Sequence, residues 1–414
     1  MLSRRNATAG DGISFQWQVA VFFAAMAAIF SRLPGAFLHP QFFAEDGWVW
    51  YQQAYNLGWL PSLGIAQAGY LQTLPRLVAG LTLLFPMRWA PLIMNLSGAI
   101  IQALPVTALL SQRCVTWGPI PLRAFMAVLY IVIPNAPEIH IVLTNAMWHF
   151  AVLQALLAFA QPPQSWRGRL VDVLVFGIGT ISGPFCILLL PCVAAYWWLR
   201  RHRWTMVTLG LLFAGTIAQV FTILNSVRTS GTALGPTPFR LLRMIAGNIF
   251  IDSMTGTGGP YLPPYILLAA FVGGLTVVVF GWRSAPLAAR LYCVFASLVL
   301  IACLRDPLLL PGSMPRWEAL ANSTTIRYWF LPSLMFLWLA TYCAGGGQAR
   351  WVRVAGLGVL TLTLIGVYRK WVYPTWPPSH WSTDVAHFEK LPRGQHMTFP
   401  VYDPGGRSME LIRK

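Results

Sequence analysis

Residues 15–48 read FQWQVAVFFAAMAAIFSRLPGAFLHPQFFAEDGW. An almost wholly apolar segment from Phe15 to Phe30 is followed, after a short connection, by the adjacent carboxylates of Glu45 and Asp46. An apolar helix of this kind is typical of a membrane span, and an ionisable group beside a span is costly unless it has a role. With Arg4 and Arg5 before it, the segment is expected to be a retained first span that begins in the cytoplasm.

The composition extends this interpretation to the whole chain. Hydrophobic residues make up 56% of the 414 positions and charged residues only 10%, and apolar runs recur from end to end. The formal charge of +17 comes mainly from arginines in the short connections between these runs. This placement is typical of a multi-pass membrane protein oriented by its positive loops, so a nucleic-acid partner is not expected. The six cysteines show no metal-type spacing.

The number of spans depends on residues 71–85. If this segment crossed the membrane, the later arginine-rich loops would all face outward, against the positive-inside rule. It also contains Pro75 and Arg76 and ends before Pro86, as suits a helix lying in the interface. The prediction is therefore an all-α bundle of about eleven spans, at residues 15–38, 89–110, 122–133, 148–160, 170–181, 186–199, 205–224, 266–280, 291–304, 328–343 and 352–368.

This topology predicts a membrane unit over residues 1–368 and a small outer tail over residues 369–414. Interfacial helices would lie in the first outer loop, at residues 38–88. A bacterial inner membrane is the expected location, with the site on the periplasmic or exterior side.

The Glu45–Asp46 pair is the first candidate site. One of these carboxylates, against the neighbouring aromatic side chains, could remove a proton from a hydroxyl, or the pair could hold a divalent cation. The alternative is a helix cap, since an acidic residue caps a helix that begins near Trp48.

The next outer loop carries a second candidate cluster. Glu138 and His140 are a potential metal ligand and proton acceptor, while Asn145, Trp148 and the nearby His149 suit the hydroxyls and faces of a sugar. An interfacial belt of Trp and His, with the asparagine capping a span, explains the same residues structurally.

A third cluster consists of arginines on the predicted outer face. Arg243, Arg316 and Arg327 run against the orientation bias, and a guanidinium pairs well with a phosphate. Arg327 and Tyr328 sit where a lipid phosphate would lie. Pairing with Glu318 and Asp306 is the structural alternative.

These pieces together resemble the GT-C superfamily of membrane glycosyltransferases. The matching elements are Phe43-Ala44-Glu45-Asp46-Gly47, the interfacial residues 69–85 with Tyr70 and Arg76, and Asn145-Ala146-Met147-Trp148. Arg327-Tyr328 is similar to the late basic element that meets the lipid phosphate in that group.

The resemblance implies an inverting transfer of a sugar from a polyprenyl-phosphate donor to a cell-envelope glycan or lipid-linked acceptor. Asp46 is the preferred base over Glu45, because it is shorter and Gly47 follows it. Arg327, aided by Arg316 or Arg243, would hold the leaving phosphate. Both metal-free chemistry and a Mg²⁺ or Mn²⁺ ion held among Glu45, Asp46, Glu138 and His140 remain open.

Membrane lipids are the other expected partners. A transporter or flippase for an envelope precursor is the alternative function. A transporter of this kind requires polar groups near the middle of the membrane, and the only candidates there in the apolar runs are Asn95, Gln102, Gln154 and Gln219.

Overall fold

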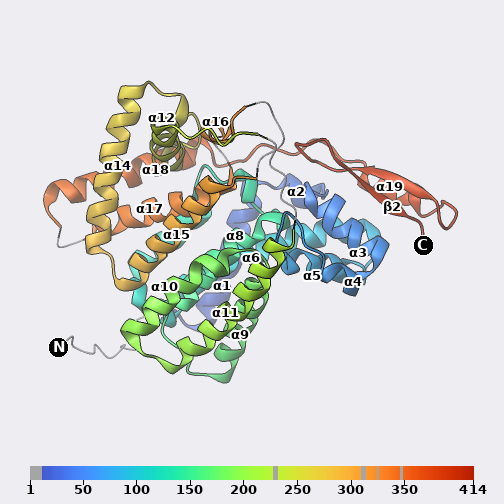
Figure 1. Cartoon of the computed structure of the whole chain (residues 1–414), viewed down its shortest axis with the longest axis horizontal. Coiled ribbons are helices and arrows are strands. Elements are labelled where there is room, and N and C mark those ends of the chain that lie inside the picture. Colours follow the sequence, from blue (N-terminus) through green and yellow to red (C-terminus); the bar gives the residue numbers. More distant parts are fainter. Residues whose placement is uncertain (1–11, 227–231, 309–313, 324–325, 346–347) are drawn as a thin grey trace.

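The computed structural model describes residues 12–226, 232–308, 314–323, 326–345 and 348–414. Arg4 and Arg5, which support the predicted orientation of the first span, lie outside these residues. The described chain is mostly helical, with a short hairpin near its end (Figure 1). The α-helices are α1 Phe15–Arg32, α2 Gly35–Leu38, α3 Gln52–Leu57, α4 Trp59–Leu63, α5 Thr73–Thr82, α6 Ala90–Leu110, α7 Ile120–Val132, α8 Ala146–Ala158, α9 Trp166–Thr180, α10 Phe185–Arg200, α11 Arg203–Leu224, α12 Pro238–Leu242, α13 Asp252–Thr255, α14 Pro264–Ser284, α15 Leu287–Arg305, α16 Arg316–Asn322, α17 Phe330–Ala344, α18 Arg350–Arg369 and α19 Trp381–Phe388.

Two π-helices and several 3₁₀ turns connect these helices. The π-helices are η1 Asp46–Tyr51 and η6 Arg243–Ile251. Short 3₁₀ segments are η2 Met87–Trp89, η3 Gln112–Trp117, η4 Pro137–Ile139, η5 Leu143–Asn145, η7 Gly259–Tyr261 and η8 Arg327–Trp329. Both π-helices lie in segments predicted to be outer loops, and such helices often mark functional sites.

Six helices in the described residues are long and apolar enough to cross a membrane. They cover Phe15–Arg32, Met87–Leu110, Arg203–Leu224, Pro264–Ser284, Leu287–Arg305 and Arg350–Arg369. The other five predicted spans correspond to α7, α8, α9, α10 and α17, which have 13, 13, 15, 16 and 15 residues. The structure therefore supports a helical protein with membrane-type helices, but not the predicted count of about eleven spans.

Two of these shorter helices, α8 and α17, lie in the interior of the bundle. Every residue of α8 is buried, and so are nearly all residues of α17. Long helices such as α11, α14 and α18 instead expose many apolar side chains on one side. A helix that is apolar all round belongs in an interior, whereas exposed apolar faces on long helices suit contact with lipid.

The helices form two neighbouring groups around this interior (Figure 1). Helices α9, α10 and α11 pack together, and α14, α17 and α18 form the other group. Helix α6 contacts α1, α7 and α8. Close approach depends on small residues: a Cβ on Gly98 of α6 would lie 1.9 Å from the carbonyl oxygen of Ile141.

The segment between α1 and α6 folds into short helices on one end of the bundle. Helix α5 has ten residues, which is about 15 Å of helix, or half of the hydrocarbon thickness of a bilayer. It is thus too short to cross a membrane, and its predicted interfacial position fits this length.

The C-terminal tail packs against these short helices (Figure 1). It contains α19 and an antiparallel hairpin of β1 His396–Pro400 and β2 Ser408–Ile412, in the register His396 opposite Ile412 and Pro400 opposite Ser408. This hairpin is a departure from the purely α-helical prediction. The amide of Ala44 donates to the carbonyl of Tyr402 at 2.9 Å, and Asn56 in α3 donates to the Glu410 carbonyl at 2.9 Å.

A buried arginine ties the start of the chain to the tail. The guanidinium of Arg32, at the end of α1, donates to the carbonyls of Ile131 and Ile133 at 2.6 and 3.2 Å and to Trp371 at 3.2 Å. It also lies 4.1 Å from the ring centre of Tyr373. Arg32 thereby satisfies free carbonyls at the end of α7 and fixes where the tail begins.

Candidate active site at the outer loops

Asp46 is buried at the start of η1, with only 1% of its surface exposed. Its Oδ1 accepts hydrogen bonds from the amide and the hydroxyl of Thr144, both at 2.7 Å. Its Oδ2 accepts one from the amide of Leu143 at 3.2 Å. Burial raises the pKa of Asp46 to about 7, and the bonds from Thr144 and Leu143 only partly oppose this.

The Asp46 carboxylate therefore changes protonation state near neutral pH. Because a carboxylate has about four acceptor positions and the three bonds occupy only part of them, Oδ2 retains capacity to accept a further proton. A side chain with this pKa and a fixed orientation is suited to general-base chemistry.

Trp50 connects Asp46 with Arg76. The indole Nε1 of Trp50 donates to the Thr144 hydroxyl at 2.7 Å, and the guanidinium carbon of Arg76 lies 4.8 Å from the centre of the Trp50 ring. One nitrogen of Arg76 donates to Gln53 at 2.6 Å. Trp50 is thus in contact with Arg76 and, through the Thr144 hydroxyl, with Asp46.

The guanidinium of Arg76 is only partly satisfied. The residue is fully buried, yet its Nε and Nη2 have no hydrogen-bond partner among the described residues. Burial lowers the pKa of Arg76 to about 10, so the group stays charged at neutral pH. A buried cation with free donors is costly, and it is suited to binding an anion.

Glu138 and Arg327 form an ion pair across the two later loops. The Glu138 carboxylate accepts from both the backbone amide and the guanidinium of Arg327. Burial alone would lower the pKa of Arg327, but the nearby Glu138 outweighs it and raises the pKa above its ordinary value. The phenols of Tyr328 and Tyr70, the latter from the first loop, also lie near enough to raise this pKa.

Asn145 and Trp148 line the segment between these two groups. The side-chain amide of Asn145 donates to the backbone carbonyl of Glu138 at 2.9 Å. The Trp148 ring lies 6.0 Å from the ring of Tyr328, and its buried Nε1 has no partner among the described residues. Residues 138–148 therefore form a platform that joins Asp46 to Arg327.

Glu45 is more exposed than Asp46 and faces the C-terminal tail. Its carboxylate lies 4.0 Å from the guanidinium of Arg407, which stacks 4.1 Å from the ring centre of Trp48. Arg407 pairs more closely with Asp403, at 2.6 Å. Glu45 thus lies in a charged cluster at the surface rather than beside the Thr144 hydroxyl.

The two histidines serve internal packing. His140 is buried, with one ring nitrogen 3.0 Å from the carbonyl of Ile29 and the other 3.1 Å from the Gln102 amide. Burial lowers the pKa of His140 well below its usual value, so the ring is neutral. Both ring nitrogens of His149 are also engaged, with the Ile139 carbonyl and the Tyr130 hydroxyl.

These histidines do not join the carboxylates predicted to hold a metal. No group of three or more His, Cys, Asp or Glu side chains in the described parts of the chain is arranged to bind a metal ion.

Arg243 and Arg316 belong to a different cluster from Arg327. Arg243 donates to the Pro260 carbonyl at 3.0 Å and to Asn322 at 2.8 Å. Arg316 pairs with Asp306 at 2.7 Å. These contacts match the structural alternative for Arg316, and they connect the segment around α12 with α16 (Figure 1).

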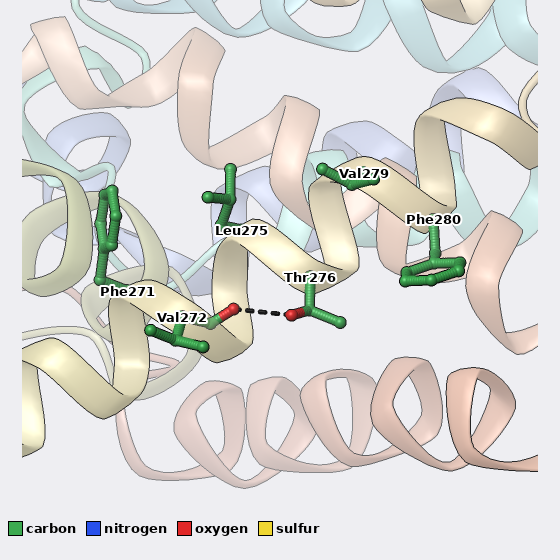
Figure 2. A pocket seen from close by; sticks show the side chains of 6 residues that line it. All are labelled: Phe271, Val272, Leu275, Thr276, Val279 and Phe280. Carbon is green, nitrogen blue, oxygen red and sulfur yellow. Dashed lines mark hydrogen bonds between the residues drawn. The ribbon is translucent and has the colours of Figure 1, made fainter.

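A shallow groove lies along α14. Figure 2 shows its six lining residues, all on this one helix and apolar except Thr276. The Thr276 hydroxyl donates to the Val272 carbonyl at 2.8 Å. Without an ionisable lining residue, this groove offers no acid–base chemistry.

Thr144 is the site residue that sequence analysis missed. It lies between Leu143 and Asn145 and carries no charge or motif of its own. Its importance comes from the fold, which places its hydroxyl between Asp46 and Trp50.

Comparison with protein-family models, with curated proteins and with solved structures found no match for this chain.

Proposed function

We propose that this protein is a membrane glycosyltransferase that moves a sugar from a polyprenyl-phosphate donor to an acceptor hydroxyl. The observation that carries the proposal is the arrangement of Asp46 and Arg76 around Trp50. A buried carboxylate with a pKa of about 7 is linked to this ring through the Thr144 hydroxyl. A buried arginine lies against the same ring, and two of its nitrogens have no hydrogen-bond partner among the described residues. Transfer from a phosphate-linked sugar requires both a base and an anion-binding group.

The reaction is a single displacement at the anomeric carbon. Asp46 accepts the proton of the acceptor hydroxyl, most directly on Oδ2, as the hydroxyl oxygen bonds to the sugar. The bond between the sugar and the phosphate oxygen breaks, and the configuration of the sugar is inverted. The polyprenyl phosphate leaves with its negative charge beside Arg76.

Arg76 is favoured over Arg327 for the phosphate because Arg327 already has a partner. Glu138 occupies both the amide and the guanidinium of Arg327, and breaking a buried ion pair is costly. Arg327, Tyr328 and Tyr70 would instead shape the wall of the substrate site. Asn145 and Trp148, next to this wall, suit hydroxyls and one face of the sugar.

The proposal includes the eleven-span topology in a bacterial inner membrane, with this site on the outer side. Helices of 13 to 16 residues measure about 20–24 Å, which is short of the hydrocarbon thickness. Interior helices such as α8 need not match that thickness, because surrounding helices rather than lipid cover them.

The test uses purified protein in proteoliposomes with a panel of polyprenyl-phosphate sugars and follows release of free polyprenyl phosphate. Asp46→Asn is expected to reduce release by about 10²–10⁴-fold, the usual contribution of a general base. Asp384→Asn, the same change in a tail acid without a side-chain role in the site, should leave release unchanged.

Arg76→Gln is expected to weaken donor use strongly, whereas Arg88→Gln, at a more exposed arginine near the same helix, should not. Absence of release with every donor, together with movement of a lipid or solute across the bilayer, would overturn the proposal in favour of transport.

A further inference from the structure

A second polar centre lies apart from this site, between η6, α13 and the loop after α7. Asn135, Asn248 and Asp252 are all buried, with 3%, 0% and 0% of their surfaces exposed. Each has one side-chain oxygen that accepts no hydrogen bond among the described residues: Oδ1 of Asn135, Oδ1 of Asn248 and Oδ2 of Asp252. Buried acceptors are normally satisfied, so three in one neighbourhood require an explanation.

The fold brings these three residues together. The side-chain amide of Asn135 donates to the backbone carbonyl of Asn248 at 3.2 Å. Asn248 and Asp252 are four positions apart along the continuous helical segment of η6 and α13, so they lie on the same side of it. Asn135 also contacts the buried Ser333 hydroxyl at 3.4 Å.

Two donors near this centre are used within the protein. The amide nitrogen of Asn248 donates to the Leu320 carbonyl at 3.2 Å. The amide of Gly259 donates to the other carboxylate oxygen of Asp252 at 2.7 Å. The three oxygens without partners are all acceptors, so what they lack is a hydrogen-bond donor or a cation.

No neighbouring side chain supplies that charge within the described residues. Asp252 forms no ion pair there, and Arg243, in the adjoining η6, is committed to Pro260 and Asn322. Lys370, at the end of α18, places its Cγ near Gly256 but is exposed. A buried carboxylate without a counter-charge is strongly unfavourable.

We propose that Asn135, Asn248 and Asp252 form a binding site for a small monovalent cation such as Na⁺. Hard cations prefer carboxylate and carbonyl oxygens, and those are the atoms that lack partners. One carboxylate balances one positive charge, which favours a monovalent over a divalent ion. A water molecule could donate to two of the oxygens, but it would leave the charge of Asp252 uncompensated.

A proton on Asp252 is the rival source of this charge. Burial raises the pKa of Asp252 to about 7, with the Gly259 amide opposing. The two sources of positive charge can be distinguished at about pH 8, because Asp252 has lost most of its proton there, whereas a metal cation still binds.

The experiment measures the unfolding midpoint of the detergent-solubilised full chain by tryptophan fluorescence, at about pH 8. NaCl is compared with choline chloride at equal ionic strength. The midpoint is expected to rise with Na⁺ concentration by several degrees, because a ligand that binds only the folded state stabilises it. Asp252→Asn should lose this rise, while Asp384→Asn should keep it.

Direct binding of radioactive sodium to the same proteins provides a readout independent of stability. Asn248→Asp adds a second carboxylate and should shift the preference from Na⁺ toward Ca²⁺, which keeps the test decisive if Asp252→Asn fails to fold. Absence of sodium binding by the native chain would overturn the proposal. So would a midpoint that responds to pH alone, since the charge would then be a proton.

Discussion

At the scale of single residues, Thr144 controls the proposed base. Its hydroxyl donates to Asp46 and accepts from Trp50, and its bond to Asp46 lowers the pKa of that carboxyl. Thr144→Val keeps the shape but removes the hydroxyl, so we expect the pKa of Asp46 to rise further. Because the base works only when deprotonated, the rate should increase as pH rises through about 7 in the native protein and at a higher pH in Thr144→Val.

The pH–rate profile of sugar transfer measures this shift, and Thr144→Ser, which keeps the hydroxyl, serves as its control. An unchanged profile in Thr144→Val would show that Asp46 is not the titrating group.

Of the residues that sequence analysis selected by their charge, Asp46, Glu138 and Arg327 lie in the site. Arg243 and Arg316 lie in a separate cluster. Asp46 was selected because acids are scarce, and Glu138 and Arg327 because they lie in outer loops. That Glu138 and Arg327 pair with each other depends on packing between segments 189 positions apart. His140 was selected for its chemistry alone, and only burial reveals that both its nitrogens serve packing.

At the scale of elements, Gly98 allows α6 to approach the platform that holds Asp46. A Cβ at this position would lie 1.9 Å from the Ile141 carbonyl oxygen, and Ile141 already has a φ of 56°, which is unfavourable for a branched residue. Gly98→Ala is therefore expected to destabilise the protein by about 1–3 kcal/mol through overpacking, and to reduce activity with it.

Gly358→Ala in α18 is the matched control, since a Cβ there meets nothing within 4 Å. It should raise stability slightly, by about 0.5–1 kcal/mol, because alanine favours a helix. Thermal unfolding of both variants in detergent measures the difference. Equal stability of the two variants would contradict the close approach of α6 to Ile141.

The elements themselves were predicted unevenly. Long apolar helices are evident in the sequence because composition alone identifies them. The hairpin of β1 and β2 was missed, since its strands are short and its packing partner is the distant first loop. The π-helical form of η1 was also unpredicted, because one extra residue per turn leaves no clear sequence pattern.

At the scale of the whole molecule, the proposed eleven-span topology makes a prediction about the two sides of the membrane. An odd number of spans, with a cytoplasmic start, places the C-terminal tail outside and the loop at Arg200 and Arg201 inside. Alkaline phosphatase fused after Lys414 should be active, and green fluorescent protein fused at Arg201 should fluoresce. A fluorescent C-terminal fusion would instead require an even number of spans.

Hydropathy identified the class of fold, but in the described residues only six of the predicted spans correspond to helices long and apolar enough to cross a membrane. The predicted spans of the interior, α8 and α17, are apolar because other helices surround them, and apolar composition alone does not separate that environment from lipid.

The contacts of Arg32 have a consequence for the order in which the protein is made. This residue leaves the ribosome early, yet it binds the Trp371 carbonyl and the Tyr373 ring, which are synthesised after the last long helix. Ala44, beside the acidic pair, and Asn56 in α3 likewise donate hydrogen bonds to Tyr402 and Glu410, which are synthesised later still. The proposed site is therefore complete only after residues 402–410 of the tail have been synthesised, when all of the long helices have already been made.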